Sequence, residues 1–154
     1  MNDSVAPFVD TNILVYAHDR SAGAKQARAR DVLDQLWRAG GGSLSVQVLQ
    51  EFYVAVTRKV PQPLDSNEAE GIVRDLATWQ VFVPNADDVL DAIRLQRRLR
   101  VSFWDALILH SAAALACDEV WSEDLNAGQV VDGVTVRNPF VTPPDPAAVC
   151  RRGA

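Results

Sequence analysis

Four acidic side chains stand out by their local context among the 20 acidic residues of this 154-residue chain. Asp10 lies between two apolar runs, and Asp124 directly follows a predicted apolar strand. Asp105 begins a nearly all-apolar helix, and Glu51 lies in the middle of another predicted helix. A charge that loses its water is costly unless something pairs with it. Chemistry is therefore expected at these four positions, whereas most other acids have polar or basic neighbours and are interpreted as solvated surface charges.

Three of the four acids also have ordinary structural explanations when each is taken alone. Asp10 is a suitable N-cap for the helix that follows it. Asp124 lies in a polar turn, where Asp is favoured. Glu51 lies off the apolar stripe that the sequence predicts for its helix, formed by Val46, Leu49, Tyr53 and Val56, and is explicable as an exposed side chain.

Asp105 has a stronger local explanation in the segment "RVSFWDALILHSAA". Ser102 and Asp105 fit the capping box, in which the acid reaches back to the N–H of the capping residue. The capping box does not explain why two bulky aromatic residues, Phe103 and Trp104, lie between the pair. The all-apolar continuation indicates a buried helix whose N-terminus reaches a cleft.

The predicted secondary structure offers a way to bring the four acids together. Short apolar strands separated by helices indicate a mainly parallel sheet in a three-layer α/β/α fold. Strand ends and helix starts share one edge of such a sheet, which is where ligands bind. We predict strands at residues 8–10, 43–46, 81–84 and 119–122, and a hairpin at 130–136 that turns on Asp132-Gly133. We predict helices at 11–17, 21–40 (stopped by glycines 40–42), 46–59, 86–99 and 104–116, and one that emerges from the connector at 61–70 and ends near 78.

A cluster of four carboxylates needs protons or cations. Two carboxylates ~4 Å apart repel by roughly 4 kcal/mol at an effective dielectric constant near 20. Oxygen ligands without nearby His or Cys favour Mg²⁺ or Mn²⁺ over zinc. His18, His110, Cys117 and Cys150 show no zinc-ligand spacing.

Composition limits the class of protein. The length fits a single domain over residues 1–154, with a core of about 7–140 and a Pro-rich tail over 141–154. No leader or membrane-spanning segment is recognisable, and the two cysteines are interpreted as free thiols, so a cytoplasmic location without membrane association is expected. The net charge of −5 argues against a surface that binds nucleic acid as a whole, but permits a local basic rim.

Four segments together resemble a PIN domain, and more narrowly the VapC-type toxins of bacterial toxin–antitoxin pairs. These segments are "FVDTNILVYA", "QVLQEFY", "VSFWDALILHSA" and "VWSEDLNAGQVVDGVTVRNPF". The resemblance implies that Asp10, Glu51, Asp105 and Asp124 form the family's acidic quartet. Asn12 and Ser122 match polar positions that support the quartet. Ala127 departs from the histidine that many relatives carry there, outside the quartet.

The resemblance also implies a function, namely an endoribonuclease that depends on Mg²⁺ or Mn²⁺ and inhibits translation or growth. Asp10 and Asp105 are expected to touch metal directly, and Glu51 and Asp124 to act through metal-bound water or a second ion. Water is the expected nucleophile, leaving a 5′-phosphate on RNA. The implied partners are a small VapB-type antitoxin and a second copy of the chain.

Basic residues near the site are candidates for contacting RNA. Arg94, Arg97 and Arg98 precede Asp105 closely, and Arg58-Lys59 ends the Glu51 helix. Phosphate contacts require such positive charge. The alternative is that arginines near a helix C-terminus complement its dipole.

Two other functions compete with the nuclease. An Asp-nucleophile phosphatase of the haloacid dehalogenase type carries D-x-D after its first strand, but Asn12 replaces the second acid here. A module that binds RNA or a partner without cleavage is the other alternative, although the presence of all four acids argues against it.

Overall fold

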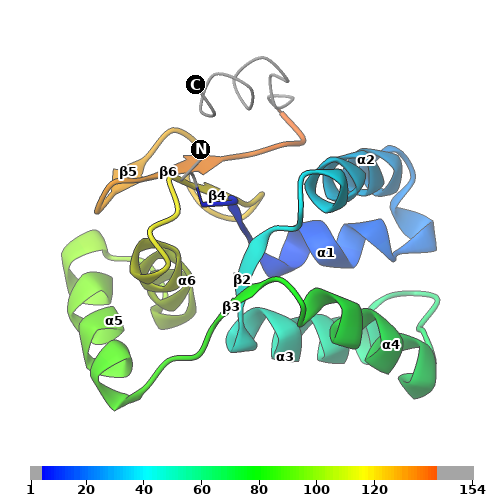
Figure 1. Ribbon diagram of the computed structural model, residues 1–154, viewed down its shortest axis with the longest axis horizontal. Helices are drawn as coiled ribbons and strands as arrows, with labels where there is room; N and C mark the ends of the chain where they lie inside the picture. Colours follow the sequence, from blue (N-terminus) through cyan, green and yellow to red (C-terminus); the bar gives the residue numbers. More distant parts are fainter. Residues whose placement is uncertain (1–4, 142–154) are drawn as a thin grey trace.

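The computed structural model describes residues 5–141, which form a six-stranded sheet with helices on both sides (Figure 1). The strand order is β3-β2-β1-β4-β6-β5, and only β5 is antiparallel to its neighbour. The three-layer, mainly parallel α/β/α prediction is therefore confirmed. The strands are β1 (Phe8–Val9), β2 (Ser43–Ser45), β3 (Gln80–Phe82), β4 (Glu119–Trp121), β5 (Val130–Val131) and β6 (Val134–Arg137).

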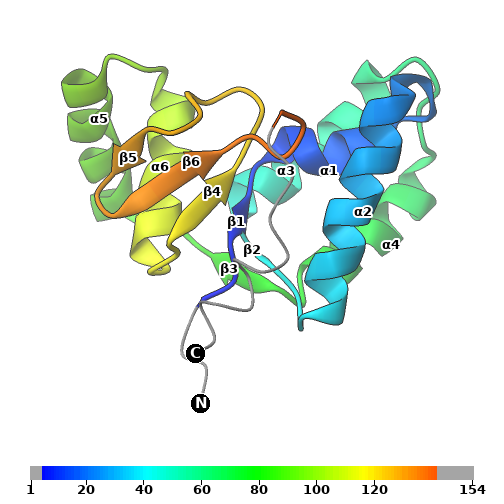
Figure 2. The same cartoon turned by 90° about the horizontal axis from the view of Figure 1, so that it is seen from above.

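Two groups of helices enclose the sheet. Figures 1 and 2 show α5 and α6 on one side and α1 to α4 on the other. The helices are α1 (Thr11–Ala17), η1 (Arg20–Ala22), α2 (Ala24–Arg38), α3 (Val46–Val54), η2 (Ala55–Lys59), α4 (Ser66–Leu76), α5 (Ala86–Leu99) and α6 (Phe103–Ala114). Among residues 5–141, no helix is both long and apolar enough to cross a membrane.

β1 lies in the middle of the sheet, hydrogen-bonded on both sides. It pairs in parallel with β2 and β4, and Phe8 and Val9 are fully buried. A strand with neighbours on both edges and helices on both faces must be apolar throughout. The polar residues of this segment therefore begin only where the strand ends, at Asp10.

The chain after Val54 differs from the predicted single helix over residues 46–59. α3 ends at Val54, and η2 continues as a π-helix to Lys59. The predicted apolar stripe is also wrong in part, because Val48 and Phe52 are buried whereas Tyr53 is 37% exposed and hydrogen-bonds Ser66. The helix is rotated so that Gln47 is buried as well.

Other boundaries move by one to three residues. β3 ends at Phe82, so that Val83 is exposed, and α6 runs from Phe103 to Ala114. The hairpin prediction is confirmed, because Asp132 and Gly133 both have positive φ, as a two-residue turn requires. The tail beyond residue 141 and Cys150 lie outside the described residues.

Candidate active site

Asp10 occupies the carboxyl end of β1, where it caps α1 and faces the loop after β4. Its Oδ1 accepts a hydrogen bond from Thr11 N–H at 2.8 Å, so the N-cap prediction is confirmed. Its Oδ2 accepts from Ser122 Oγ at 2.7 Å and from Asn12 Nδ2 at 3.2 Å. With only 6% exposure, this carboxylate is held on three sides by neutral donors.

The surroundings of Asp10 favour its protonated form. Burial raises the pKa of Asp10 to about 6, and the charges of Glu51 and Asp124 add to the rise. The hydrogen bonds from Ser122 and Thr11 act in the opposite direction but are outweighed. Neutral donors therefore do not fully replace the lost water, and a nearby cation would favour the ionised form.

Glu51 is positioned by one side chain from α1 and one from its own helix, α3. Thr11 Oγ1 donates to Glu51 Oε2 at 2.8 Å, and Gln47 Nε2 donates to Glu51 Oε1 at 2.8 Å. Gln47 Nε2 also lies 3.4 Å from the carbonyl oxygen of Trp104. These contacts fix the α3 carboxylate against the starts of α1 and α6.

Asp124 joins the same network through Asn12 and Ser122. Asn12 Nδ2 donates to Asp124 Oδ2 at 3.0 Å, and Asn12 Oδ1 accepts from Glu123 N–H at 3.1 Å. Ser122 Oγ accepts from Asp124 N–H at 3.1 Å while donating to Asp10. The Asn12 amide thus donates to two of the four acids, Asp10 and Asp124. The Ser122 hydroxyl both orients the Asp10 carboxylate and accepts a backbone N–H of the turn that carries Asp124.

Asp105 starts α6, where Ser102 Oγ accepts its N–H at 3.0 Å. Burial raises the pKa of Asp105, and the charges of Asp124 and Glu51 raise it further. The same two acids raise the pKa of Asp10. Glu51 and Asp124 therefore act electrostatically on both Asp10 and Asp105.

The donor set suits a hard divalent cation. Within residues 5–141, the hydrogen-bonding partners of the four acids are hydroxyl, amide or backbone N–H groups, not cationic side chains. Oxygen-only sites of this kind favour Mg²⁺ or Mn²⁺. Among residues 5–141, however, no three of these four acids bring ligand atoms within 4.8 Å of one another, so metal binding by the quartet stays a prediction.

The arginines of α5 are engaged elsewhere. Arg94 pairs with Asp91 at 2.9 Å, and Arg98 pairs with Asp132 at 3.0 Å. Asp132 precedes β6, which runs parallel to β4, whereas Asp124 follows β4, so this pair lies toward the opposite sheet edge. Arg97 is exposed. Their contact with RNA stays a prediction.

Arg58 and Lys59 are also placed without contact to the acids. Both are exposed at the end of the π-helical η2. They remain available to a ligand that extends beyond the α3 helix.

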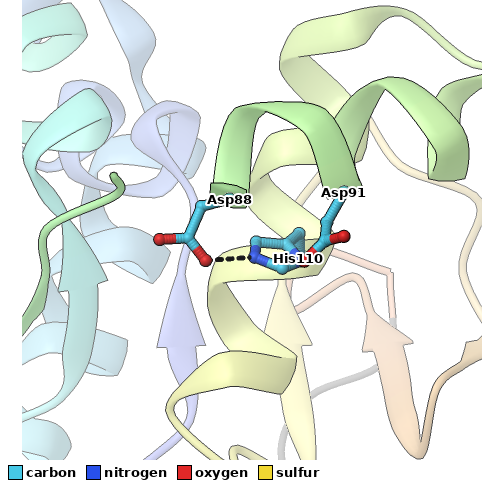
Figure 3. Close-up of side chains that lie close together, drawn as sticks. All are labelled: Asp88, Asp91 and His110. Carbon is cyan, nitrogen blue, oxygen red and sulfur yellow. Dashed lines mark hydrogen bonds and ion pairs between the residues drawn. The ribbon is translucent and has the colours of Figure 1, made fainter. Parts of the chain in front are cut away.

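A second cluster of metal-binding side chain types lies away from the quartet. Asp88 and Asp91 of α5 face His110 of α6, and ligand atoms of all three lie within 4.8 Å of one another (Figure 3). Asp88 Oδ1 lies 2.8 Å from His110 Nε2, and Asp88 Oδ2 accepts from Asn85 N–H in a capping box. Asp91 already pairs with Arg94 on its own helix, and the contact between Asp88 and His110 joins α5 to α6, so both carboxylates have protein partners.

The sequence reading missed the two side chains that hold Glu51. Thr11 follows Asp10 directly, so its nearness to the site was readable from the motif. Gln47 precedes Glu51 by four positions, the spacing that places two side chains on one helix face. Its burial at 6% exposure was the further signal, but only the packed structure reveals it.

The fold and the site together define an α/β protein with acidic and amide side chains gathered at the carboxyl edge of a parallel sheet. A family model, that of the PIN domain, matches residues 8–132, which include all four acids. This chain belongs to the PIN domain family. No curated protein sequence matches it significantly.

Solved structures of low sequence identity share the fold. A toxin–antitoxin complex from Klebsiella pneumoniae has a TM-score of 0.62 at 18% identity, covering 84% of this chain and 96% of that one. VapC20 of Mycobacterium tuberculosis, a Sarcin-Ricin loop cleaving toxin, has a TM-score of 0.57 at 18% identity, covering 75% and 87%. VapBC2 from Rickettsia felis, bound to a promoter DNA fragment, has a TM-score of 0.59 at 17% identity, covering 85% of this chain and 96% of that one.

Proposed function

We propose that this PIN-domain protein is an endoribonuclease that requires Mg²⁺ or Mn²⁺ and acts as the toxin of a toxin–antitoxin pair. The observation that carries the proposal is that Glu51 and Asp124 act electrostatically on both Asp10 and Asp105, while the hydrogen bonds to these acids come from neutral donors. Such an arrangement stores repulsion that a divalent cation relieves. It is poorly suited to binding a phosphate backbone without one.

The quartet divides into two roles in this proposal. Asp10 and Asp105 hold the cation directly, and Glu51 and Asp124 act through water or hold a second ion. When bound, the cation neutralises phosphate oxygens and makes water a stronger acid. Glu51 and Asp124 are the two candidates for accepting the proton of the attacking water.

The neutral side chains preorganise these groups. Thr11 and Gln47 fix both oxygens of Glu51, so its orientation does not have to be established during the reaction. Asn12 and Ser122 do the same for Asp10 and Asp124. The expected products are RNA fragments with a 5′-phosphate, and Arg94, Arg97 and Arg98 are proposed as backbone contacts.

The biological role is proposed from the structural neighbours. One is a toxin–antitoxin complex, one is named as a toxin that cleaves the Sarcin-Ricin loop, and one is a VapBC complex on promoter DNA. We accordingly propose RNA as the substrate, a small VapB-type antitoxin and a second copy of the chain as partners, and the cytoplasm as the site of action.

Cleavage by purified variants tests the activity. We expect Asp10→Asn and Asp105→Asn to lose Mg²⁺- or Mn²⁺-dependent RNA cleavage while keeping the circular dichroism spectrum of the wild type, because each loses a proposed metal ligand. EDTA must abolish the wild-type activity. Asp65→Asn is the matched control, since Asp65 also caps a helix but lies on α4. Cleavage retained by either site variant rules out the assignment.

Growth inhibition tests the toxin role separately. Expression of the wild type is expected to stop growth of a bacterial host, whereas Asp10→Asn is not. If a small antitoxin-like reading frame lies directly upstream of the gene, its co-expression should restore growth. Cleavage in vitro without any growth defect would support the nuclease and contradict the toxin role.

A further inference from the structure

Trp104 presents an exposed indole beside the acidic site. Its side chain is 60% exposed, the highest value for an aromatic residue within residues 5–141. It immediately precedes Asp105 at the start of α6. Helix capping explains why Ser102 and Asp105 lie at the start of α6. It does not explain why a large apolar ring between them is exposed to water.

Two contacts fix Trp104 relative to the acidic site. The rings of Phe103 and Trp104 meet edge to face, with centroids 5.1 Å apart. The carbonyl oxygen of Trp104 lies 3.4 Å from Gln47 Nε2, and the same amide donates to Glu51. The backbone of Trp104 is thus held by the same amide that holds Glu51, and its exposed indole is carried by the residue next to Asp105, within reach of a chain bound at the site.

We propose that Trp104 is a stacking subsite for an unpaired RNA base next to the scissile phosphodiester. The inference rests on the proposed nuclease function and names the substrate class of the same site. Every base has an apolar face that stacks on aromatic side chains, so such a subsite tolerates different sequences. Trp104 is thus a substrate-positioning residue rather than a catalytic one.

The charge of the site favours stacking as a means of holding RNA here. Four mutually interacting carboxylates repel phosphates at short range, and Arg94 and Arg98 are paired with Asp91 and Asp132. Stacking on a neutral ring supplies affinity at the acidic edge that does not depend on opposite charge. Because the faces of a paired base are covered by its neighbours in a duplex, the subsite selects single-stranded or looped RNA.

Removing the base and removing the ring should have the same effect if they contact each other. We would compare wild type and Trp104→Ala on a single-stranded oligoribonucleotide and on copies with one abasic nucleotide on either side of the cleavage position. We expect Trp104→Ala to lower kcat/KM about 5- to 100-fold, mainly through KM. With wild type, one of the two abasic oligonucleotides should show a similar loss of kcat/KM. With Trp104→Ala, the same abasic oligonucleotide should be cleaved almost as well as the intact one, because the ring that its base would contact is already gone.

Matched variants separate stacking from folding. Trp104→Phe and Trp104→Tyr should recover part of the loss. Trp37→Ala removes another exposed indole, on α2, and should leave kcat/KM unchanged. Equilibrium binding to the cleavage-deficient Asp10→Asn protein in Mn²⁺, with and without Trp104→Ala, reports the subsite without cleavage. Binding of the labelled single-stranded oligonucleotide should be tighter than binding of its duplex, and Trp104→Ala should weaken it.

The outcomes are distinguishable. Wild-type protein that cleaves no RNA overturns the proposed function, whereas the binding assay still decides the subsite. Unchanged binding and kcat/KM in Trp104→Ala, or abasic sensitivity that persists in it, overturns the subsite. A change of oligomeric state in sedimentation with unchanged RNA binding would instead assign Trp104 to a protein interface.

Discussion

At the scale of single residues, Asp10 combines two roles that conflict energetically. It caps α1 and belongs to the acidic site, yet burial and neighbouring acids raise the pKa of its carboxyl group to about 6. Asn and Asp cap helices about equally well. Capping alone therefore does not require a carboxylate at this position.

Asp10→Asn should stabilise the metal-free protein. Between pH 3.8 and about 6 the folded state keeps a proton that the unfolded chain has released, so the free energy of unfolding falls as pH rises through this window. The shift of roughly two pKa units corresponds to a loss of up to about 3 kcal/mol above the window. Thermal unfolding in EDTA at about pH 8 should show a higher Tm for the variant.

The same comparison in acid serves as a check. Well below the window both states carry the proton, so the advantage of Asp10→Asn should disappear. Asp65→Asn, an exposed cap on α4, should show no such gain at either pH. If Asp10→Asn is less stable than wild type above the window, the Asp10 carboxylate does not destabilise the metal-free protein as proposed.

Thr11 illustrates a neutral residue whose role is to hold an acid. Thr11→Val keeps the shape but removes the hydroxyl that donates to Glu51. We expect kcat to fall by about 10- to 100-fold, as is typical for residues that orient metal ligands. Steady-state cleavage kinetics and Tm provide the measurement. Thr57, on η2, donates its hydroxyl to the carbonyl oxygen of Tyr53. Thr57→Val removes this bond away from the acids and should retain wild-type kinetics.

At the scale of elements, the link between α2 and β2 sets where α3 and Glu51 lie. The chain turns there through Gly40 and Gly41, which both have positive φ. Gly42 then passes directly over Trp79, a side chain that is only 6% exposed. The predicted glycine stop thus has a second purpose, close approach to an aromatic ring.

Gly42→Ala is expected to destabilise the protein by about 1 to 3 kcal/mol through overpacking. A Cβ there would lie 2.7 Å from Cζ3 and 2.9 Å from Cε3 of buried Trp79. Gly71→Ala in α4 meets nothing within 4 Å and should stabilise by up to about 1 kcal/mol. Urea unfolding of both variants measures the difference. Equal effects would mean that Trp79 yields easily.

At the scale of the whole molecule, the four acids come from segments that are far apart along the chain. A cation held among them, as proposed, would link the ends of β1 and β4 with α3 and the start of α6. Binding to the folded state alone stabilises it by mass action. Metal binding should therefore be visible as global stability, even without substrate.

Adding Mn²⁺ to EDTA-treated protein should raise Tm. At free cation of about 100 Kd the gain is about 2.7 kcal/mol, or about 5 to 10 °C for a chain of this size. Asp105→Asn should lose most of this shift, whereas His110→Ala should keep it, because His110 belongs to the separate cluster on α5 and α6. Loss of the shift in His110→Ala alone would move the metal site to that cluster.

Sequence reasoning was most successful where the relevant information is local. Apolar runs, helix caps and the Asp132-Gly133 turn predicted the element order, and the strand-end positions of Asp10 and Asp124 predicted the sheet edge they occupy. It was less successful for α3, where Tyr53 was expected inside and Phe52 is buried instead. Both residues carry a large aromatic ring, so only the packing of neighbouring helices decides which of them is buried.

The sequence by itself determined which chemical groups are available and which end of each element carries them. Periodicity and capping are properties of neighbouring residues, so the chain states them directly. The tertiary structure decided which partners these groups meet: that Gln47 turns inward to hold Glu51, that Arg98 reaches Asp132, and that Asp88 meets His110. Such contacts join elements whose relative angles arise only when the core packs, and no local pattern records them.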